Sequence, residues 1–276
     1  MSRDKALFDR VRHPLKVRVL RVRHVTSLTP AMRRITFTGP DLEGFCSLAS
    51  DDHVKVFFPR PGEEMPVLPA IGPLGVVLPK LGPKPIARDY TPLCFDPVAG
   101  ELDIDFFLHG HGVASAWAAN ATEGQVVGVA GPRGSFVPTR PFAWELFVAD
   151  ETAFPEMHHR IERLPAATRV RLVAVVNGCE EEQPLPKRDD LEVRWVHRPH
   201  PDADASDALV EAVRALGLPD GEGFAWVAGE ASQVRAVYRH LVRERGLPTS
   251  HIHTSGHWKR GVVAHDHHQP IRMEDE

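Results

Sequence analysis

The chain has 276 residues, of which 42% are hydrophobic and 25% are charged, and its formal net charge is −4. This is an ordinary composition for a globular protein, and the length allows two domains with cores of their own. The negative charge argues against general affinity for nucleic acid or anionic membranes, and no apolar run is long enough for a membrane helix or the core of a signal peptide.

The first half of the chain carries short runs in which apolar and polar residues alternate. This alternation is typical of half-buried strands, and several short strands joined by turns indicate an antiparallel barrel or sandwich. We expect strands within residues 15–25, 32–39, 53–59, 101–109 and 124–132. Eight prolines between Pro59 and Pro85 predict an irregular excursion, either a binding loop or a poorly ordered flap, because proline cannot donate to a ladder.

After about residue 140 the pattern changes to strands that alternate with helices. Strands are expected within residues 144–150, 169–176, 191–198, 224–230 and 251–256, and helices within 152–164, 205–217 and 231–246. This alternation predicts a parallel sheet with helices on both faces. We therefore expect an antiparallel barrel domain over residues 1–140, followed by a parallel-sheet α/β domain over residues 141–276.

Ligands of parallel sheets bind at the carboxyl ends of the strands. One crevice is then lined by Asp150 and Glu151, His197 and Arg198, Gly229 and Glu230, and Gly256. Arg198 either meets the 2′-phosphate of a nucleotide or caps its strand in solvent. The choice between NADPH and NADH stays open.

The stretch ARDYTPLCFD (Ala87–Asp96) holds one of only two tyrosines in the chain. In a strand Arg88 and Tyr90 face one side, and a twist or bulge beside the prolines brings Thr91 back toward them. A cation suits a phosphate, tyrosine suits a flat ring and threonine can hydrogen-bond a ring nitrogen. A flavin dinucleotide needs all three, although these residues alone equally fit an edge strand with a solvated arginine.

A second stretch, LHGHGVASAWAANA (Leu108–Ala121), predicts a strand end, a glycine turn and a short helix. Gly110 and Gly112 permit positive φ, and the first helical turn near Ala114 and Ser115 presents free N–H groups, which favours a pyrophosphate. The partial match to a Rossmann fingerprint is weak, because no acidic strand end follows about 20 residues on.

With both stretches the chain resembles the siderophore-interacting proteins, flavin-dependent ferric-siderophore reductases related to ferredoxin–NADP reductases. The family's arginine-x-tyrosine-threonine motif matches Arg88-Asp89-Tyr90-Thr91, and its histidine-glycine and alanine-serine-x-tryptophan segment matches His109-Gly110 and Ala114-Ser115-Ala116-Trp117. Further similarity lies in GPRGSF, VADETAFPE, WVAGEASQVRAVYRHL and SGHWKRG, in order from about Leu15 to Gly261.

The resemblance implies a flavin-binding barrel and a nucleotide-binding α/β domain. It implies that Arg88 holds flavin phosphate, Tyr90 stacks on the isoalloxazine and Thr91 lies near its reactive nitrogen. The residues expected to bind FAD are Arg88, Tyr90, Thr91, His109, Gly112, Ala114, Ser115 and Trp117. Those expected to bind NADPH or NADH are Asp150, Glu151, Thr152, Gly229 and Glu230.

Ferric siderophores are often anionic, and Lys55, Lys259 and Arg260 resemble the family's basic substrate site. Lys55 is otherwise a solvated lysine on a strand face, and Lys259 and Arg260 are otherwise charges of the tail. No protein nucleophile or general base is expected, because the cofactor carries the chemistry.

The sequence departs from the family pattern at a few positions. Leu93 stands where a second arginine is usual, Val113 replaces a proline after Gly112, and His257 replaces an aromatic residue. Arg133 is a candidate to neutralise the flavin diphosphate in place of the missing arginine.

We therefore predict a reductase that passes electrons from NADPH or NADH through FAD to Fe(III), releasing iron as Fe(II). A reduced ferredoxin is another possible donor. The alternatives are a general flavin or ferredoxin-type reductase with a different acceptor, and a flavin-free siderophore or haem carrier. We expect a monomer or weak dimer.

The remaining residue types point to no metal site. Cys46, Cys94 and Cys179 lie far apart without CxxC spacing, so a reducing cytoplasm fits best. The C-terminal histidines lack rigid spacing, and a solvated tail is favoured over a metal site; they are His251, His253, His257, His265, His267 and His268.

Overall fold

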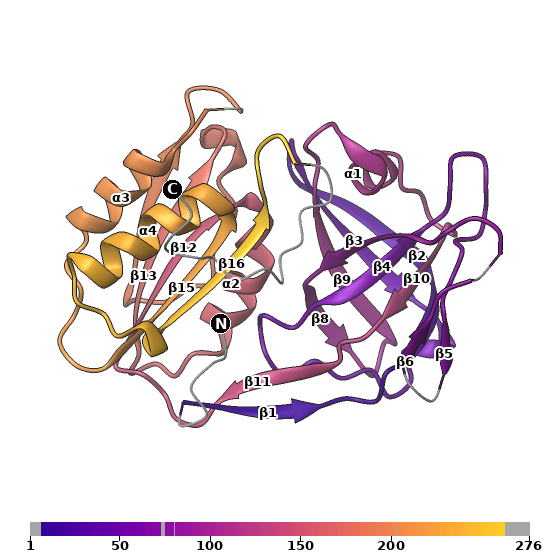
Figure 1. Cartoon of the computed structure of the whole chain (residues 1–276), viewed down its shortest axis with the longest axis horizontal. Helices are drawn as coiled ribbons and strands as arrows, with labels where there is room; N and C mark the ends of the chain where they lie inside the picture. The colour runs from indigo at the N-terminus through magenta and orange to yellow at the C-terminus, as the bar shows by residue number, and fades with distance from the viewer. Residues whose placement is uncertain (1–6, 73–74, 80, 202, 263–276) are drawn as a thin grey trace. The chain divides into compact units, whose positions relative to one another are not determined.

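The computed structural model describes residues 7–72, 75–79, 81–201 and 203–262 (Figure 1). Packing divides the chain into two units, one formed by Asp9–Val137 and the other by Phe8 with the chain from Pro138 onward. It remains a prediction that residues 1–140 bind FAD and that residues 141–276 bind NADPH or NADH. His265, His267 and His268 of the histidine-rich tail lie outside the described residues.

The first unit is built on a seven-stranded antiparallel sheet that contains all five strands expected from the alternating runs. In spatial order these strands are β7 (Ile86–Tyr90), β4 (Val54–Phe58), β10 (Val126–Ala130), β2 (Val17–Thr29), β3 (Met32–Thr38), β9 (Glu101–Phe107) and β8 (Pro92–Asp96). β7 and β8 stand at opposite ends of this order, yet Thr91 alone joins them. The sheet therefore curves until its two edges meet near Thr91, as in a barrel.

Two smaller strand pairs that were not predicted lie wholly or mostly in this unit. β1 (Phe8–Arg12) pairs with β11 (Gly134–Pro138), and the proline-rich excursion contains a short hairpin of β5 (Ala70–Gly72) and β6 (Gly75–Val77). The unit also holds the 3-10 helix η1 (Pro40–Leu42).

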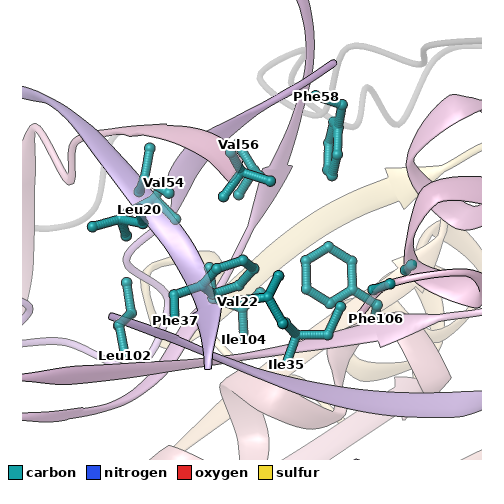
Figure 2. Close-up of a cluster of buried hydrophobic side chains, with 14 of the residues drawn as sticks. Leu20, Val22, Ile35, Phe37, Val54, Val56, Phe58, Leu102, Ile104 and Phe106 are labelled. Atoms are coloured by element: carbon teal, nitrogen blue, oxygen red, sulfur yellow. The ribbon is translucent and has the colours of Figure 1, made fainter. Parts of the chain in front are cut away.

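The barrel core collects the inward-facing side chains of the alternating strands (Figure 2). Its largest members are Phe37, Phe58 and Phe106, each less than 2% exposed. The short helix α1 (Gly112–Ala119) is held on this core by Trp117, whose ring centroid lies 5.2 Å from that of Phe58 and 5.9 Å from that of Phe106. An eight-residue helix is marginal alone, so this contact fixes its position.

The second unit has a five-stranded parallel sheet of spatial order β14, β13, β12, β15, β16. The strands are β12 (Trp144–Asp150), β13 (Arg169–Val176), β14 (Leu191–His197), β15 (Gly223–Glu230) and β16 (Ile252–Trp258). The helices are α2 (Phe154–Arg163), α3 (Ser206–Ala215) and α4 (Ala231–Arg243), with 3-10 helices η2 (Glu151–Ala153), η3 (Cys179–Glu181) and η4 (Thr249–His251).

Helices cover both faces of this sheet, as predicted. Leu146 and Val148 of β12 pack with α3 and α4 on one face. On the other face Glu145 of β12 accepts hydrogen bonds from Arg160 of α2, at 2.9 Å for Nε. The predicted fold class, an antiparallel barrel followed by a parallel α/β unit, is confirmed. Within the described parts of the chain, no helix has the length and apolar character that a membrane span requires.

Candidate functional site

The turn into α1 leaves open space and free donors beside its backbone. Gly110 and Gly112 have φ of 77° and 76°, and a Cβ added at either would meet nothing within 4 Å. The N-cap residue His111 makes no side-chain capping bond, and the first turn carries no acidic residue. Since the first four N–H groups of a helix lack partners within it, this turn can accept an anion.

One arginine and two histidines lie at the same place. Arg88 donates to its neighbour's carbonyl, Ala87 O, at 2.7 Å, and no carboxylate in the described part of the chain pairs with it. Burial lowers the pKa of His109, and the charges of His111 and Arg88 lower it further. The rings of His109 and His111 lie 6.3 Å apart. Arg88 and the two histidines therefore act on one small region next to the α1 turn.

Tyr90 lies on the same side of β7 as Arg88. Its ring is half-buried, with its centroid 4.4 Å from that of Phe106 and 6.2 Å from that of Phe58. Burial raises the pKa of its phenol, while the Arg88 charge acts in the opposite direction. Thr91 is also half-buried and lies between β7 and β8, and a register shift follows at Pro92–Cys94, so the chain departs from a regular strand where a twist or bulge was predicted.

These residues suit FAD. The unpaired guanidinium, the open glycine turn and the uncapped helix match a diphosphate, and Tyr90 offers an aromatic surface. Ala114 and Ser115 are 6% and 3% exposed, so their side chains are buried and the groups near this turn that suit an anion are backbone N–H groups. Trp117 is packed into the core and positions α1.

Lys55 has a partner that the sequence reasoning did not consider. It is paired in register with Asp89 across β4 and β7, and its Nζ lies 2.7 and 2.8 Å from the two carboxylate oxygens. Val54 and Val56 on either side of Lys55 point into the barrel core. Because side chains alternate along a strand, Lys55 and Asp89 occupy the opposite face from Arg88 and Tyr90.

In the second unit Asp150 connects three parallel strands at their carboxyl ends. Its Oδ2 accepts from the Glu230 backbone N–H at 2.9 Å and from Trp258 Nε1 at 2.7 Å, and its Oδ1 accepts from Thr152 N and Oγ1 at 2.9 and 2.6 Å. A Cβ on Gly229 would lie 2.7 Å from this carboxylate, so glycine is required there. Asp150 is 1% exposed, so it holds the carboxyl edge of the sheet in place through buried hydrogen bonds.

Glu230 also has internal partners. Its Oε2 caps α4 by accepting from Ser232 N at 2.7 Å and Gln233 N at 3.1 Å, and its Oε1 accepts from the Arg260 backbone N–H at 3.1 Å. This carboxylate occupies the anion position of the α4 N-terminus. Glu230 therefore holds the closing segment in place, and a nucleotide phosphate does not have that position available.

Glu151 and Arg198 form a buried pair, in which Nη1–Oε1 is 2.6 Å and Nη2–Oε2 is 2.9 Å. Arg198 also donates to Asn177 Oδ1 at 3.0 Å and is only 5% exposed. Burial lowers the pKa of Arg198, but the hydrogen bonds and charge of Glu151 outweigh burial and raise it overall. The expectation that Arg198 caps its strand in solvent is wrong, because the residue is buried. Contact with a 2′-phosphate stays a prediction, and in this structure both guanidinium N–H groups that would make it donate to Glu151.

Two residues that sequence reasoning passed over belong in this description. His111 lies beside His109 at the start of α1, and the repeated histidine-glycine pair of LHGHG was the signal for it. Gln233 lines a small cavity with Asp150 and Glu230, enclosed by the paired strands β12 and β15 and by α3 and α4, where the strand order reverses. It is 2% exposed, and among the described residues its Nε2 has no acceptor.

The closing segment carries the other predicted substrate cations. Lys259 is exposed, and Arg260 donates through Nη2 to Ala203 O at 3.0 Å. His257 lies 3.2 Å from Thr152 Oγ1 through Nδ1, and its Nε2 is 3.7 Å from Glu156. Within the described ranges, no group of three or more histidines, cysteines or carboxylates is arranged to hold a metal ion.

Comparison with known proteins identifies the class to which this architecture belongs. Residues 21–136 match the family profile described as the siderophore-interacting FAD-binding domain, and residues 142–261 match the profile described as siderophore-interacting protein. The chain belongs to the siderophore-interacting protein family, and the resemblance inferred from its motifs is confirmed.

Particular relatives sharpen this assignment. The chain is 36% identical over 255 residues to the NADPH-dependent ferric-chelate reductase of Escherichia coli, covering 91% of this chain and 96% of the relative. It is 30% identical to the ferric vibriobactin reductase ViuB of Vibrio cholerae, covering 86% and 87% of the two chains. A siderophore utilization protein from T. fusca has a similar crystal structure, with a TM-score of 0.86, 38% identity and coverage of 95% and 100%.

Proposed function

We propose that this protein is an FAD-dependent reductase of ferric siderophores that takes its electrons from NADPH. The observation that carries the proposal lies in one region of the barrel unit. It combines an Arg88 without a carboxylate partner in the described ranges, an open Gly110–Gly112 turn and a helix without a side-chain cap there. The named activities of the Escherichia coli and Vibrio cholerae relatives support the choice of donor and acceptor.

Each candidate site residue of the barrel unit has a positioning role in this proposal. Arg88 and the α1 N–H groups hold the diphosphate, Tyr90 provides the surface for the ring system, and Thr91 offers a hydroxyl at the break between strands. Bound FAD supplies the conversion between hydride transfer and single-electron transfer. No side chain is required as a nucleophile or general base.

The overall reaction balances without a further reactant. One NADPH gives up a hydride, two ferric ions each gain one electron, and one proton is released. Hard oxygen ligands hold Fe(II) less well than Fe(III), because Fe(II) carries less charge. Reduction therefore weakens the siderophore's hold on iron.

Several finer points belong to the proposal as expectations from the sequence. The siderophore is anionic and meets Lys55, Lys259 and Arg260, the protein works in the cytoplasm as a monomer or weak dimer, and a reduced ferredoxin is an alternative donor. Asp150, Glu151, Thr152, Gly229 and Glu230 are proposed to shape the nucleotide edge through the backbone that they hold.

The test combines cofactor identification with an acceptor panel. Purified protein should be yellow and release FAD, and colourless protein that still binds ferric siderophores would favour the flavin-free carrier. Anaerobic trapping of Fe(II) should then be followed with ferric catecholates and hydroxamates and with NADPH, NADH or reduced ferredoxin as donor. Turnover of free flavin or ferricyanide without any ferric siderophore would favour a general flavin reductase instead.

A further inference from the structure

The feature that carries a further inference is the ion pair between Lys55 and Asp89. Both carboxylate oxygens of Asp89 lie within hydrogen-bond distance of the Lys55 ammonium, at 2.7 and 2.8 Å. The pair is formed across neighbouring strands in register, so the backbone itself keeps the two groups opposite each other. Lys55 is therefore not a free cation but one that already has an internal anion.

The pair is accessible to a ligand. The side chain of Lys55 is 46% exposed and that of Asp89 is 21% exposed, so water and small anions reach the ammonium. An exposed pair of this kind is weak, since its Coulomb energy is screened and both side chains lose rotamer freedom. An external anion of higher charge can therefore displace the carboxylate.

Asp89 does not form the same ion pair with Arg88. Alternation along β7 puts Asp89 on the opposite face from Arg88 and Tyr90, and Arg88 donates to a backbone carbonyl, Ala87 O. β7 thus carries Arg88, which is open to a ligand, on one face, and Asp89, which is paired with Lys55, on the other. This separation allows Asp89 to act on Lys55 while leaving the positive region at α1 intact.

We propose that Asp89 is a specificity-determining residue that competes with the anionic substrate for Lys55. A small anion of single charge gains from Lys55 no more than Asp89 already provides, so it is rejected. A ferric complex with several negative charges gains more and displaces the carboxylate. Competition by the internal anion for Lys55 thereby raises discrimination at the expense of affinity. The inference rests on the proposed function, because it takes an anionic ferric complex as the ligand of Lys55.

The experiment uses the full-length holoprotein and the isosteric variant Asp89→Asn, alone and in a Lys55→Met background. The probe is a gallium(III) tris-catecholate complex, an anion that cannot be reduced under these conditions, and its dissociation constant is followed by quenching of protein fluorescence. A neutral gallium(III) tris-hydroxamate complex is measured alongside. Inorganic phosphate is tested as a competitor. Glu123→Gln is the matched control, because it removes another exposed carboxylate of the barrel unit, paired with Arg23 at 3.4 Å.

Asp89→Asn should tighten binding of the anionic complex about two- to fivefold, as expected for an exposed ion pair, and make phosphate a better competitor. The neutral complex and the Glu123→Gln protein should show no such gain. In the Lys55→Met background the gain should disappear. An unchanged dissociation constant, or an equal gain without Lys55, would overturn the proposal.

A second variant covers the case in which Asp89→Asn is poorly folded. Asp89→Ser should show the same gain, and FAD content and thermal unfolding report on folding. Loss of FAD in both variants would place Asp89 in flavin binding and overturn the proposal. The proposed function is judged separately by Fe(II) trapping with the wild-type protein, so that either idea can fail while the other stands.

Discussion

The two units place their candidate site residues in opposite surroundings. Among the residues that the structure describes, Arg88 of the barrel unit has only a backbone acceptor, Gly110 and Gly112 border open space, and α1 has no side-chain cap. In the second unit Asp150 and Glu230 are each 1% exposed, with internal donors on both carboxylate oxygens. The first set is available to a ligand, and the second set holds backbone in place.

The difference teaches that motif residues of one family do different physical work. A carboxylate at the end of a buried strand needs hydrogen bonds to offset its desolvation, and nearby backbone N–H groups supply them. Such a residue fixes the position of several strands at once. Substitution in the second unit should therefore first reduce stability, whereas substitution at the barrel site should first reduce ligand binding.

The largest effect is expected from removing one member of the buried pair Glu151–Arg198. Arg198→Met should lower the free energy of unfolding by about 3–5 kcal/mol, because it leaves Glu151 buried without its partner. Urea denaturation of the holoprotein measures this. Glu222→Gln, which opens the exposed pair with Arg140, is the control and should change the urea midpoint much less than Arg198→Met does. A loss of NADPH affinity without a loss of stability would show that Arg198 binds ligand after all.

A second prediction concerns His159, a buried histidine of α2 in the same unit. Burial, with further effects of Arg163, His158 and Arg160, lowers its pKa to about 4, so its neutral form is favoured in the folded state. The unfolded chain binds the proton near pH 6.5, so the stabilisation is present above that pH and is lost as pH falls through about 4. The stabilisation of the folded state that is lost amounts to about 2–3 kcal/mol.

Urea midpoints at a series of pH values between neutrality and about pH 4 test this prediction. The His159→Met protein should lose less stability than the wild type over that range. Parallel curves for the two proteins would show that the histidine is protonated equally in the folded and unfolded states.

A third prediction sharpens the barrel side of the comparison. Tyr90→Ala should weaken FAD binding by about 1 kcal/mol or more, because it removes the aromatic surface beside Phe106. Fluorescence titration of the apoprotein with FAD measures the change. Tyr90→Phe keeps the ring and should bind FAD like the wild type. Retention of FAD with unchanged affinity and spectrum by the alanine variant would show that this strand does not contact the flavin.

The smallest expected effect is a pH dependence of FAD affinity. Burial and neighbouring charges lower the pKa of His109, and a bound diphosphate should raise it again, so FAD binding takes up a proton. Affinity should rise about threefold as pH falls through the usual histidine range near 6.5. His109→Gln should flatten this slope, and the exposed His24→Gln should leave it as it is. Equal slopes in all three proteins would remove His109 from the site.

Particular residues show how far sequence reasoning reached. The strands at 144–150 and 169–176 were predicted with the bounds that β12 and β13 have, because continuous apolar runs ending at polar residues are specific for buried parallel strands. β1 and β11 were missed, because their pairing is long-range and neither segment has a strong alternating pattern. The motif at Arg88–Thr91 was located correctly on a strand that breaks at Thr91.

The partners of charged groups were the main failure. Nothing local in the sequence indicates that Arg198 meets Glu151, 47 residues away, or that Lys55 meets Asp89, 34 residues away. Both were treated as cations available to a ligand. Ion pairs depend on which strands become neighbours and in which register, and a single sequence does not contain that information.

The amino-acid sequence by itself determined the two-part architecture, the family and the location of the cofactor motifs, because alternation, apolar runs and glycine turns are local properties of the chain. Only the tertiary structure decided which polar groups are free and which are occupied. Strand order and register bring Asp150 beneath Gly229 and Asp89 opposite Lys55. Whether a charge is available to a ligand depends on such neighbours, since desolvation and pairing act through space rather than along the chain.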